Sequence, residues 1–361
     1  MLTGMEHAPL PPLTASVIGG GLGGRLSLDA LARSPLFRLT GAVDLRAEVR
    51  AELEQKYPGL RTFATHQELF AACPTEVVCV STWAPSHAAI TRDALALPLK
   101  AILVEKPLGD TVAAGQDIIE RVRAKGIPMA VPHGLMVRRC PLEVIFRVQA
   151  GEIGELRLVE IQSPKWDIVN AGIHWLQFLL NVAGNPAAES VLCACDTSSR
   201  TYRDGFQVET SSITQVELAN GVRGILITGD RLRSNGERGD TTFRLIGTRG
   251  QIEFWGWAGD YRISNAAHPG GTVVTPEEEP RTAHQRHLEA LVPQIASDVC
   301  DYTMATSSLA ALELVEAAYL SARHHCQVRL PLASFTPPTA SDWDPGRPYS
   351  GSGGGLDGRT V

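Results

Sequence analysis

The sequence lacks several features that would each point to a class of protein. It has no excess of positive charge, because Lys and Arg together number 33 and Asp and Glu 39, for a formal net charge of −6. Nucleic-acid backbones and anionic membrane surfaces repel such a protein on average, so we expect neither as a partner. No apolar run approaches the roughly 20 residues that span a bilayer, and we therefore predict no membrane-spanning helix.

The seven cysteines form no CxxC motif and no paired spacing. This scatter is typical of reduced thiols and indicates neither a disulfide framework nor a bound metal. Residues 1–13 contain an acidic residue and three prolines, whereas a secretory signal has a basic start and an apolar segment. We expect a disordered lead-in over 1–13 and a cytoplasmic location.

Two patterns divide the 361 residues, a length that suits two domains. Over 14–133, short apolar runs alternate with segments of helical spacing, which is typical of parallel βαβ units. After Gly151 the runs alternate apolar with polar residues, as in an antiparallel sheet with one buried face. We predict a doubly wound, mostly parallel α/β domain over 14–133 and an α+β domain with a large, mainly antiparallel open sheet over 134–335. A flexible tail rich in Pro, Gly and Ser would follow over 336–361.

A glycine-rich turn follows the first predicted strand and precedes a helix. Gly19, Gly21 and Gly24 match GxGxxG in the strand–turn–helix context that dinucleotide-binding folds require. The first glycine allows the tight turn, the second lets the backbone approach a pyrophosphate, and the third lets the helix pack on the strand. Leu22 begins the helix, whose N-terminal amides would bind phosphate. A glycine turn without a ligand is the alternative, but we predict a Rossmann domain that binds a nicotinamide cofactor.

Asp44 ends the next predicted strand, twenty residues after Gly24. A carboxylate there accepts a hydrogen bond from the 2′-hydroxyl of an adenosine ribose and repels a 2′-phosphate, which favours NAD over NADP. Arg46 could pair with that phosphate if Asp44 turned aside, so NADP stays an alternative. Asp44 could also be only a helix cap.

Two further strand ends place polar residues at the carboxyl edge of the parallel sheet, where ligands bind. Glu105 and Lys106 end one strand and precede a proline; Lys106 could face the cofactor or form only a surface ion pair. Thr82, Trp83 and His87 follow another strand and could line the nicotinamide side, although His87 could simply begin a helix. We predict that these five residues contact the cofactor.

These residues together resemble the Gfo/Idh/MocA family of nicotinamide-dependent sugar and cyclitol oxidoreductases. The glycine turn, the Glu-Lys-Pro tripeptide at 105–107 and the Gly-Glu-Ile-Gly segment at 151–154 carry the resemblance, which spans about residues 15–330. It implies hydride transfer between NAD(P) and a carbinol carbon of a sugar, sugar derivative or cyclitol. It also implies that Lys106 binds substrate and takes part in catalysis.

The Asp-x-x-x-His pair of the family corresponds here to Asn170 and His174, so the acid has become an amide. Residues four apart share a helix face and can converge on one ligand. Because an amide cannot ionise, we expect Asn170 to orient a hydroxyl and His174 to exchange the proton, while Lys106 polarises the same oxygen. A second departure is Trp83-Ala84, where the family has Pro-Asn.

Three other residues are candidate substrate contacts. Trp166 could stack on the apolar face of a sugar ring, although it could equally be a core residue. His133 and Arg138 follow the last predicted strand of the first domain, where the resemblance implies substrate contact. We interpret His284 and His287 as structural or solvated, since no acid or thiol stands at metal-ligand spacing from them.

Two alternatives to a net dehydrogenase remain, and the amide at position 170 favours the first of them. The chain could be a non-catalytic dinucleotide-binding regulator, or a glycoside-processing enzyme in which NAD is reduced transiently and regenerated in place. In each case the expected ligand is a small polyhydroxylated molecule. Since the open sheet leaves an apolar face, we also expect a homodimer or homotetramer through the C-terminal sheet.

Overall fold

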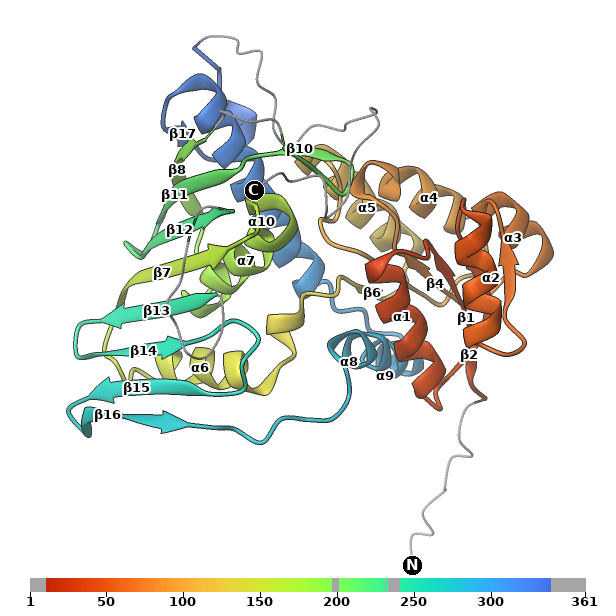
Figure 1. The fold of residues 1–361 in the computed structure, drawn as a ribbon, viewed down its shortest axis with the longest axis horizontal. Coiled ribbons are helices and arrows are strands. Elements are labelled where there is room, and N and C mark those ends of the chain that lie inside the picture. Colours follow the sequence, from red (N-terminus) through yellow and green to blue (C-terminus); the bar gives the residue numbers. More distant parts are fainter. Residues whose placement is uncertain (1–10, 197–200, 231, 233–240, 339–361) are drawn as a thin grey trace, which may run out of the picture.

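The computed structural model describes residues 11–196, 201–230, 232 and 241–338, and two domains lie side by side (Figure 1). The first contains a six-stranded parallel sheet in the order β3-β2-β1-β4-β5-β6. Its strands are β1 (Leu13–Ile18), β2 (Phe37–Val43), β3 (Arg61–Phe63), β4 (Val77–Val80), β5 (Ala101–Val104) and β6 (Met129–Ala130). The strand order reverses between β1 and β4, so the predicted doubly wound Rossmann sheet is confirmed.

Helices cover both faces of this sheet. They are α1 (Leu22–Arg33), α2 (Ala47–Lys56), α3 (His66–Ala72), α4 (His87–Ala94) and α5 (Val112–Lys125), with short 3₁₀ turns η1 (Ala84–Ser86) and η2 (Gly134–Met136). Alternate residues of β4 enter different hydrophobic clusters, because Val77 and Cys79 face one side of the sheet and Val78 and Val80 the other. This strand is therefore buried on both faces, as a central parallel strand requires.

The second domain is built on a nine-stranded sheet in the order β16-β15-β14-β13-β7-β12-β11-β8-β17. Its strands are β7 (Leu156–Pro164), β8 (Ala188–Cys195), β11 (Ser211–Leu218), β12 (Arg223–Gly229), β13 (Thr242–Gly247), β14 (Gly250–Phe254), β15 (Tyr261–Asn265), β16 (His268–Val274) and β17 (Val328–Arg329). Strands β7 and β12 pair in parallel and the other neighbours pair antiparallel. The predicted class of the second domain is confirmed. A separate ribbon of β9 (Thr201–Arg203) and β10 (Phe206–Val208) follows β8.

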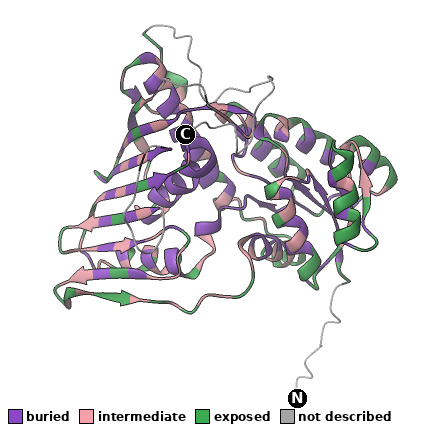
Figure 2. Ribbon diagram, in the orientation of Figure 1, coloured by how far each residue is buried: buried purple, intermediate pink, exposed green. Residues whose placement is uncertain are grey.

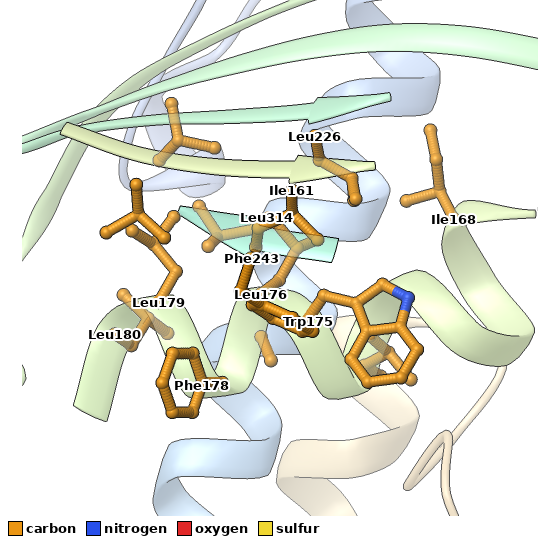
Figure 3. Close-up of a cluster of buried hydrophobic side chains, with 14 of the residues drawn as sticks. Ile161, Ile168, Trp175, Leu176, Phe178, Leu179, Leu180, Leu226, Phe243 and Leu314 are labelled. Atoms are coloured by element: carbon orange, nitrogen blue, oxygen red, sulfur yellow. The ribbon is translucent and has the colours of Figure 1, made fainter. Parts of the chain in front are cut away.

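One face of the nine-stranded sheet is covered by helices. They are α6 (Arg139–Gln149), the π-helical turn η3 (Ile168–Gly172), α7 (Ile173–Val182) and α10 (Thr303–His324), and a short turn η4 (Leu332–Ser334) follows β17. Helix α7 packs its apolar side chains between the sheet and α10 (Figure 3). The rings of Trp175 and Phe178 lie 5.2 and 5.4 Å from that of Phe243 on β13. On the opposite face, half-buried and exposed residues follow one another (Figure 2).

Helices α8 (Ala283–Glu289) and α9 (Leu291–Ser297) come late in the chain and yet pack on the first domain. Leu288 and Leu291 share a hydrophobic cluster with Leu28 of α1, and α8 lies beside α1 (Figure 1). The helical segment is interrupted between α8 and α9, because Pro293 has no N–H to donate to the carbonyl of Glu289. The chain therefore returns to the first domain and extends the contact between the two domains.

Several predictions of absence concern only part of the chain. Most of the predicted lead-in over 1–13 and tail over 336–361 lies outside the described residues, and β1 already begins at Leu13. Within the described ranges, no helix has both the length and the apolar character needed to cross a membrane. In the same ranges, no group of three or more His, Cys, Asp or Glu side chains could hold a metal ion.

Candidate active site

The glycine turn connects β1 to α1 at the carboxyl edge of the parallel sheet. Gly19 has a φ of +107°, which L side chains rarely adopt, and a Cβ on Gly24 would lie 1.8 Å from the carbonyl oxygen of Gly19. Both positions therefore require glycine. A Cβ on Gly21 would meet no atom within 4 Å, so the start of α1 borders open space that a pyrophosphate could enter. Leu22, the first residue of that helix, is exposed.

Asp44 follows β2 and lies beside the glycine turn. Its Oδ2 accepts a hydrogen bond from the N–H of Gly20 at 2.9 Å, and its Oδ1 accepts one from the N–H of Arg46 at 2.9 Å. The guanidinium of Arg46 also donates to both oxygens, at 2.9 and 3.1 Å. Burial raises the pKa of the Asp44 carboxyl, but these donors lower that pKa by more, so the group is ionised at neutral pH. The open turn, the helix N-terminus and this carboxylate fit a dinucleotide.

The segment after β4 contains three of the predicted cofactor contacts. Thr82 hydrogen-bonds Ser86 through their hydroxyls at 2.7 Å, and Trp83 is 55% exposed. His87 is instead fully buried, with Nε2 at 2.9 Å from the carbonyl oxygen of Thr82 and Nδ1 at 3.3 Å from that of Leu108. The prediction that His87 contacts the cofactor is therefore corrected, because its ring is enclosed by backbone that it holds in place. Burial lowers the pKa of His87.

Lys106 joins the two domains at the carboxyl end of β5. Its Nζ donates to the backbone carbonyl oxygen of Asn170, in the turn η3, at 2.7 Å. The preceding Glu105 is buried and bonds Nε2 of His284, on α8, at 2.8 Å. Burial raises the pKa of Glu105, but His284 and Lys106 lower it by more. These two consecutive residues thus contact two separate elements from the later part of the chain.

Buried polar groups hold the turn that carries Asn170. Asp167 accepts a hydrogen bond from the N–H of Asn170 at 2.7 Å, and Glu209 accepts one from the N–H of Ile168 at 2.8 Å. The side chain of Asn170 is 5% exposed, and its Nδ2 has no hydrogen-bond partner within the described part of the chain. A buried donor of this kind is costly unless it is paired.

His174, near the start of α7, lies against His133. The two Nδ1 atoms are 3.2 Å apart, and the rings stand nearly perpendicular with centroids 5.0 Å apart. Nε2 of His133 lies 2.8 Å from the hydroxyl oxygen of Ser308 on α10. The prediction that His133 contacts substrate is therefore corrected. This ring is fully buried and both of its nitrogens have protein partners.

Burial lowers the pKa of His174 well below its usual value of 6.5, and the positive charge of Lys106 lowers it further. The same two causes, in the same order, lower the pKa of His133. Both imidazoles are consequently neutral at neutral pH and can each accept a proton. His284 and His287 also lie close enough to affect His174, and burial lowers the pKa of His287 to about 4.

Trp257, from the loop after β14, is part of the site although no sequence motif marks it. Its ring centroid lies 5.7 Å from that of His174, and the residue is 47% exposed. Arg138 donates to the carbonyl oxygen of Trp257 and so holds this loop. Trp166 instead stacks on the guanidinium of Arg203 at 4.8 Å and packs against the core. Direct contacts of Arg138 and Trp166 with the substrate stay predictions, and Trp257 adds an aromatic ring close to His174.

Asp204 lies within electrostatic range of Lys106, and no sequence motif marks it. It lies in the tight turn between β9 and β10, with a φ of +49°. The next residue, Gly205, packs on the first domain, where a Cβ would lie 3.2 Å from the ring of Trp83. The ribbon therefore reaches across to the Rossmann domain (Figure 1). Burial raises the pKa of Asp204 and the positive charge of Lys106 opposes this, so the two groups lie within electrostatic range.

The parallel sheet with its open glycine turn, joined to an open mixed sheet, defines a two-domain protein of the dinucleotide-binding class. Residues 13–133 match the Gfo/Idh/MocA family, described as an oxidoreductase family with an NAD-binding Rossmann fold. The first domain of the chain therefore belongs to the Gfo/Idh/MocA oxidoreductase family.

Known relatives match about half of the chain. It is 30% identical over 175 residues to the uncharacterized oxidoreductase YfiI of Bacillus subtilis (strain 168), a match that covers 45% of this chain and 44% of that protein. It is 28% identical over 175 residues to the inositol 2-dehydrogenase of Rubrobacter xylanophilus, covering 45% of this chain and 50% of that protein. The chain thus spans about half the length of the curated relatives it matches.

Among solved structures, a levoglucosan dehydrogenase in complex with NADH and levoglucosan has the same fold. The TM-score is 0.73 over 89% of this chain and 100% of that one, at 18% sequence identity. This match extends the likeness of fold beyond the Rossmann domain to the second domain.

Proposed function

We propose that the chain is an NAD-dependent dehydrogenase or reductase that acts on a CH–OH group of a sugar, sugar derivative or cyclitol. The observation that carries the proposal is the junction of Lys106 with the turn that leads to His174. This junction brings an ammonium from one domain and a neutral imidazole from the other to the edge of the sheet where a dinucleotide binds. The inositol and levoglucosan dehydrogenases to which the chain is similar support this substrate class.

The cofactor supplies the acceptor or donor of the hydride. Gly19, Gly21 and Gly24, with the amides of α1 from Leu22 onward, would hold the pyrophosphate, and Asp44 would accept from the ribose 2′-hydroxyl. Arg46 is already paired with Asp44 through both carboxylate oxygens, which supports NAD over NADP. Thr82, Trp83 and Glu105 would lie towards the nicotinamide end.

The residues of the second domain would handle the substrate. His174 exchanges the hydroxyl proton, because it is neutral and Nε2 carries no hydrogen bond from the described residues. Lys106 donates to the same oxygen and polarises the C–O bond. Asn170 offers its unpaired Nδ2 to a neighbouring hydroxyl. Trp257 would present a ring face to the C–H side of the substrate.

A substrate panel tests the proposal. Purified protein with NAD is offered cyclitols, sugars and glycosides, and we expect net NADH formation with at least one polyol. A Lys106→Met variant provides the matched background rate. NAD binding without any turnover would favour the regulator, and glycoside cleavage without net NADH would favour transient oxidation; either result would overturn the proposed net dehydrogenase.

We also propose that copies of the chain associate through the outer face of the nine-stranded sheet. Ile213 on β11 is 57% exposed and Leu192 on the neighbouring β8 is 47% exposed. Ile213 pairs with Ile227 of β12 and with Ala194 of β8 in the register, so apolar side chains adjoin one another across three strands. Burying this patch in an interface would be favourable. Light scattering should show a dimer or tetramer that Ile213→Asp weakens, and a monomeric wild type would refute the interface.

A further inference from the structure

We propose that Ser308 and His133 form a positioning chain that determines which ring nitrogen of His174 carries its proton. The proposal rests on the function above, in which His174 exchanges the substrate proton. It assigns a role to two side chains that would not themselves touch the substrate.

The chain consists of two short contacts between elements far apart in the sequence. The hydroxyl oxygen of Ser308 lies 2.8 Å from Nε2 of His133, and Nδ1 of His133 lies 3.2 Å from Nδ1 of His174. Ser308 is on α10, His133 follows β6 and His174 is on α7. Ser308 and His133 have no exposed surface. Without water within reach, these polar atoms must satisfy one another.

The contact between the two Nδ1 atoms couples the protonation of the two rings. Each neutral imidazole has one N–H donor and one acceptor nitrogen, so a hydrogen bond between Nδ1 atoms needs a proton on one of them and a lone pair on the other. A proton on Nδ1 of His174 leaves Nε2 of that ring as an acceptor. A proton on Nδ1 of His133 requires Nε2–H on His174, which makes His174 a donor.

The hydroxyl of Ser308 is the switch between these two arrangements, because it can accept from Nε2 of His133 or donate to it. When the hydroxyl accepts, His133 donates from Nε2 to Ser308, its Nδ1 accepts from His174, and Nε2 of His174 keeps its lone pair. In this form His174 can act as a base, because the lone pair of its Nε2 can accept a proton. In oxidation the substrate O–H bond would break with its proton going to Nε2 of His174, and a bound nicotinamide would accept the hydride of the C–H bond with its electron pair.

The second arrangement serves the reverse reaction. There the hydroxyl of Ser308 donates to Nε2 of His133, whose Nδ1–H donates to His174, and Nε2–H of His174 is ready to protonate the oxygen of a carbonyl substrate. Since both arrangements use the same contacts between heavy atoms, the site can change direction by proton exchange at the ring nitrogens and rotation of the Ser308 hydroxyl, without moving either ring. A residue that only packed against His174 could not provide this.

The test is nitrogen NMR on the full-length protein labelled with ¹⁵N-histidine, with His174→Gln and His133→Gln used to assign the signals. We expect one protonated and one unprotonated Nδ1 in the wild-type pair. Ser308→Ala should change the signals of His174, which it does not contact, and lower kcat/KM about 3- to 10-fold, as expected for one buried hydrogen bond. Ser308→Thr keeps a hydroxyl and should restore both.

Ser307→Ala is the matched control, because the hydroxyl of Ser307 lies on the adjacent position of α10 and bonds Asn181 at 2.7 Å instead. It should leave the signals of His174 unchanged. Unprotonated Nδ1 atoms on both rings of the wild type, or signals of His174 that do not respond to Ser308→Ala, would overturn the positioning chain. The NMR result needs no substrate, so it decides this proposal even if the substrate panel fails.

Discussion

The cofactor half and the substrate half of the site are constructed in different ways. The cofactor half consists mainly of backbone, because the turn at Gly19 and the contact at Gly24 leave no room for a side chain. The substrate half consists of side chains that reach His174 from several elements. The first half is therefore specified by consecutive residues, whereas the second depends on how distant segments pack.

The largest expected effect comes from removing the two central groups of the substrate half. Lys106→Met and His174→Ala should each lower kcat by about 10²-fold or more, because each removes a group that handles the reacting oxygen or its proton. Both variants should bind NAD nearly as the wild type does, as measured by calorimetry. Near-normal turnover in either variant would show that the role assigned to that residue is wrong.

The cofactor half can be probed with two alanine substitutions in one turn. A Cβ on Gly24 would meet the Gly19 carbonyl oxygen, so Gly24→Ala should lower the free energy of unfolding by about 1–3 kcal/mol. A Cβ on Gly21 meets nothing, so Gly21→Ala should change that free energy by no more than about 0.5 kcal/mol and still weaken NAD binding. Urea unfolding and calorimetry distinguish the two effects. Equal stability of the two variants would contradict the packing described.

A smaller effect is expected from the carboxylate beside the turn. Asp44→Asn should weaken NAD binding about tenfold, since a hydrogen bond to a charged group is replaced by a neutral one. The same change frees Arg46 from its ion pair and should raise the preference for NADP relative to NAD. The ratio of the two dissociation constants is the measurement. An unchanged ratio would show that Asp44 does not determine the preference between NAD and NADP.

The last prediction concerns pH and the buried histidines, and its effect develops only in acid. The pKa of His287 is about 4 in the folded protein, below its usual 6.5, so the unfolded chain binds a proton more readily between these values. The stability that this neutral ring contributes is fully present above pH 6.5 and is lost as pH falls towards 4, at about 1.4 kcal/mol per pH unit.

His287→Gln tests this pH dependence. The glutamine amide can still donate to the carbonyl oxygen of His133, which His287 contacts at 3.1 Å, but it cannot titrate. The free energy of unfolding, measured in urea at a series of pH values, should therefore fall less steeply with acid in the variant. Identical slopes in wild type and variant would rule out a buried neutral His287.

The difference between the cofactor half and the substrate half also explains which parts of the molecule could be predicted from the sequence. Apolar periodicity predicted both sheets, and the glycine turn, Asp44 and Lys106 were found because each lies in a short segment with a local signature. His87 begins α4, as one of the two interpretations of this residue expected, but the sequence gives no sign of the backbone that encloses its ring.

The substrate half was predicted less completely. Ser308 lies 175 positions from His133, and Trp257 comes from a loop with no motif of its own. The periodicity of apolar residues indicates that a segment has a buried face, but it does not indicate which other segment covers that face. For the same reason, the sequence could not predict that α8 packs on the first domain and brings His284 to Glu105.

The most direct test of the whole site is a crystal structure with NAD and a polyol from the substrate panel. We predict that the reacting hydroxyl oxygen lies within hydrogen-bond distance of both Nζ of Lys106 and Nε2 of His174, with its carbon facing the nicotinamide ring. A polyol bound elsewhere, or a bound cofactor with Lys106 and His174 on opposite sides of a closed interface, would contradict the proposed dehydrogenase.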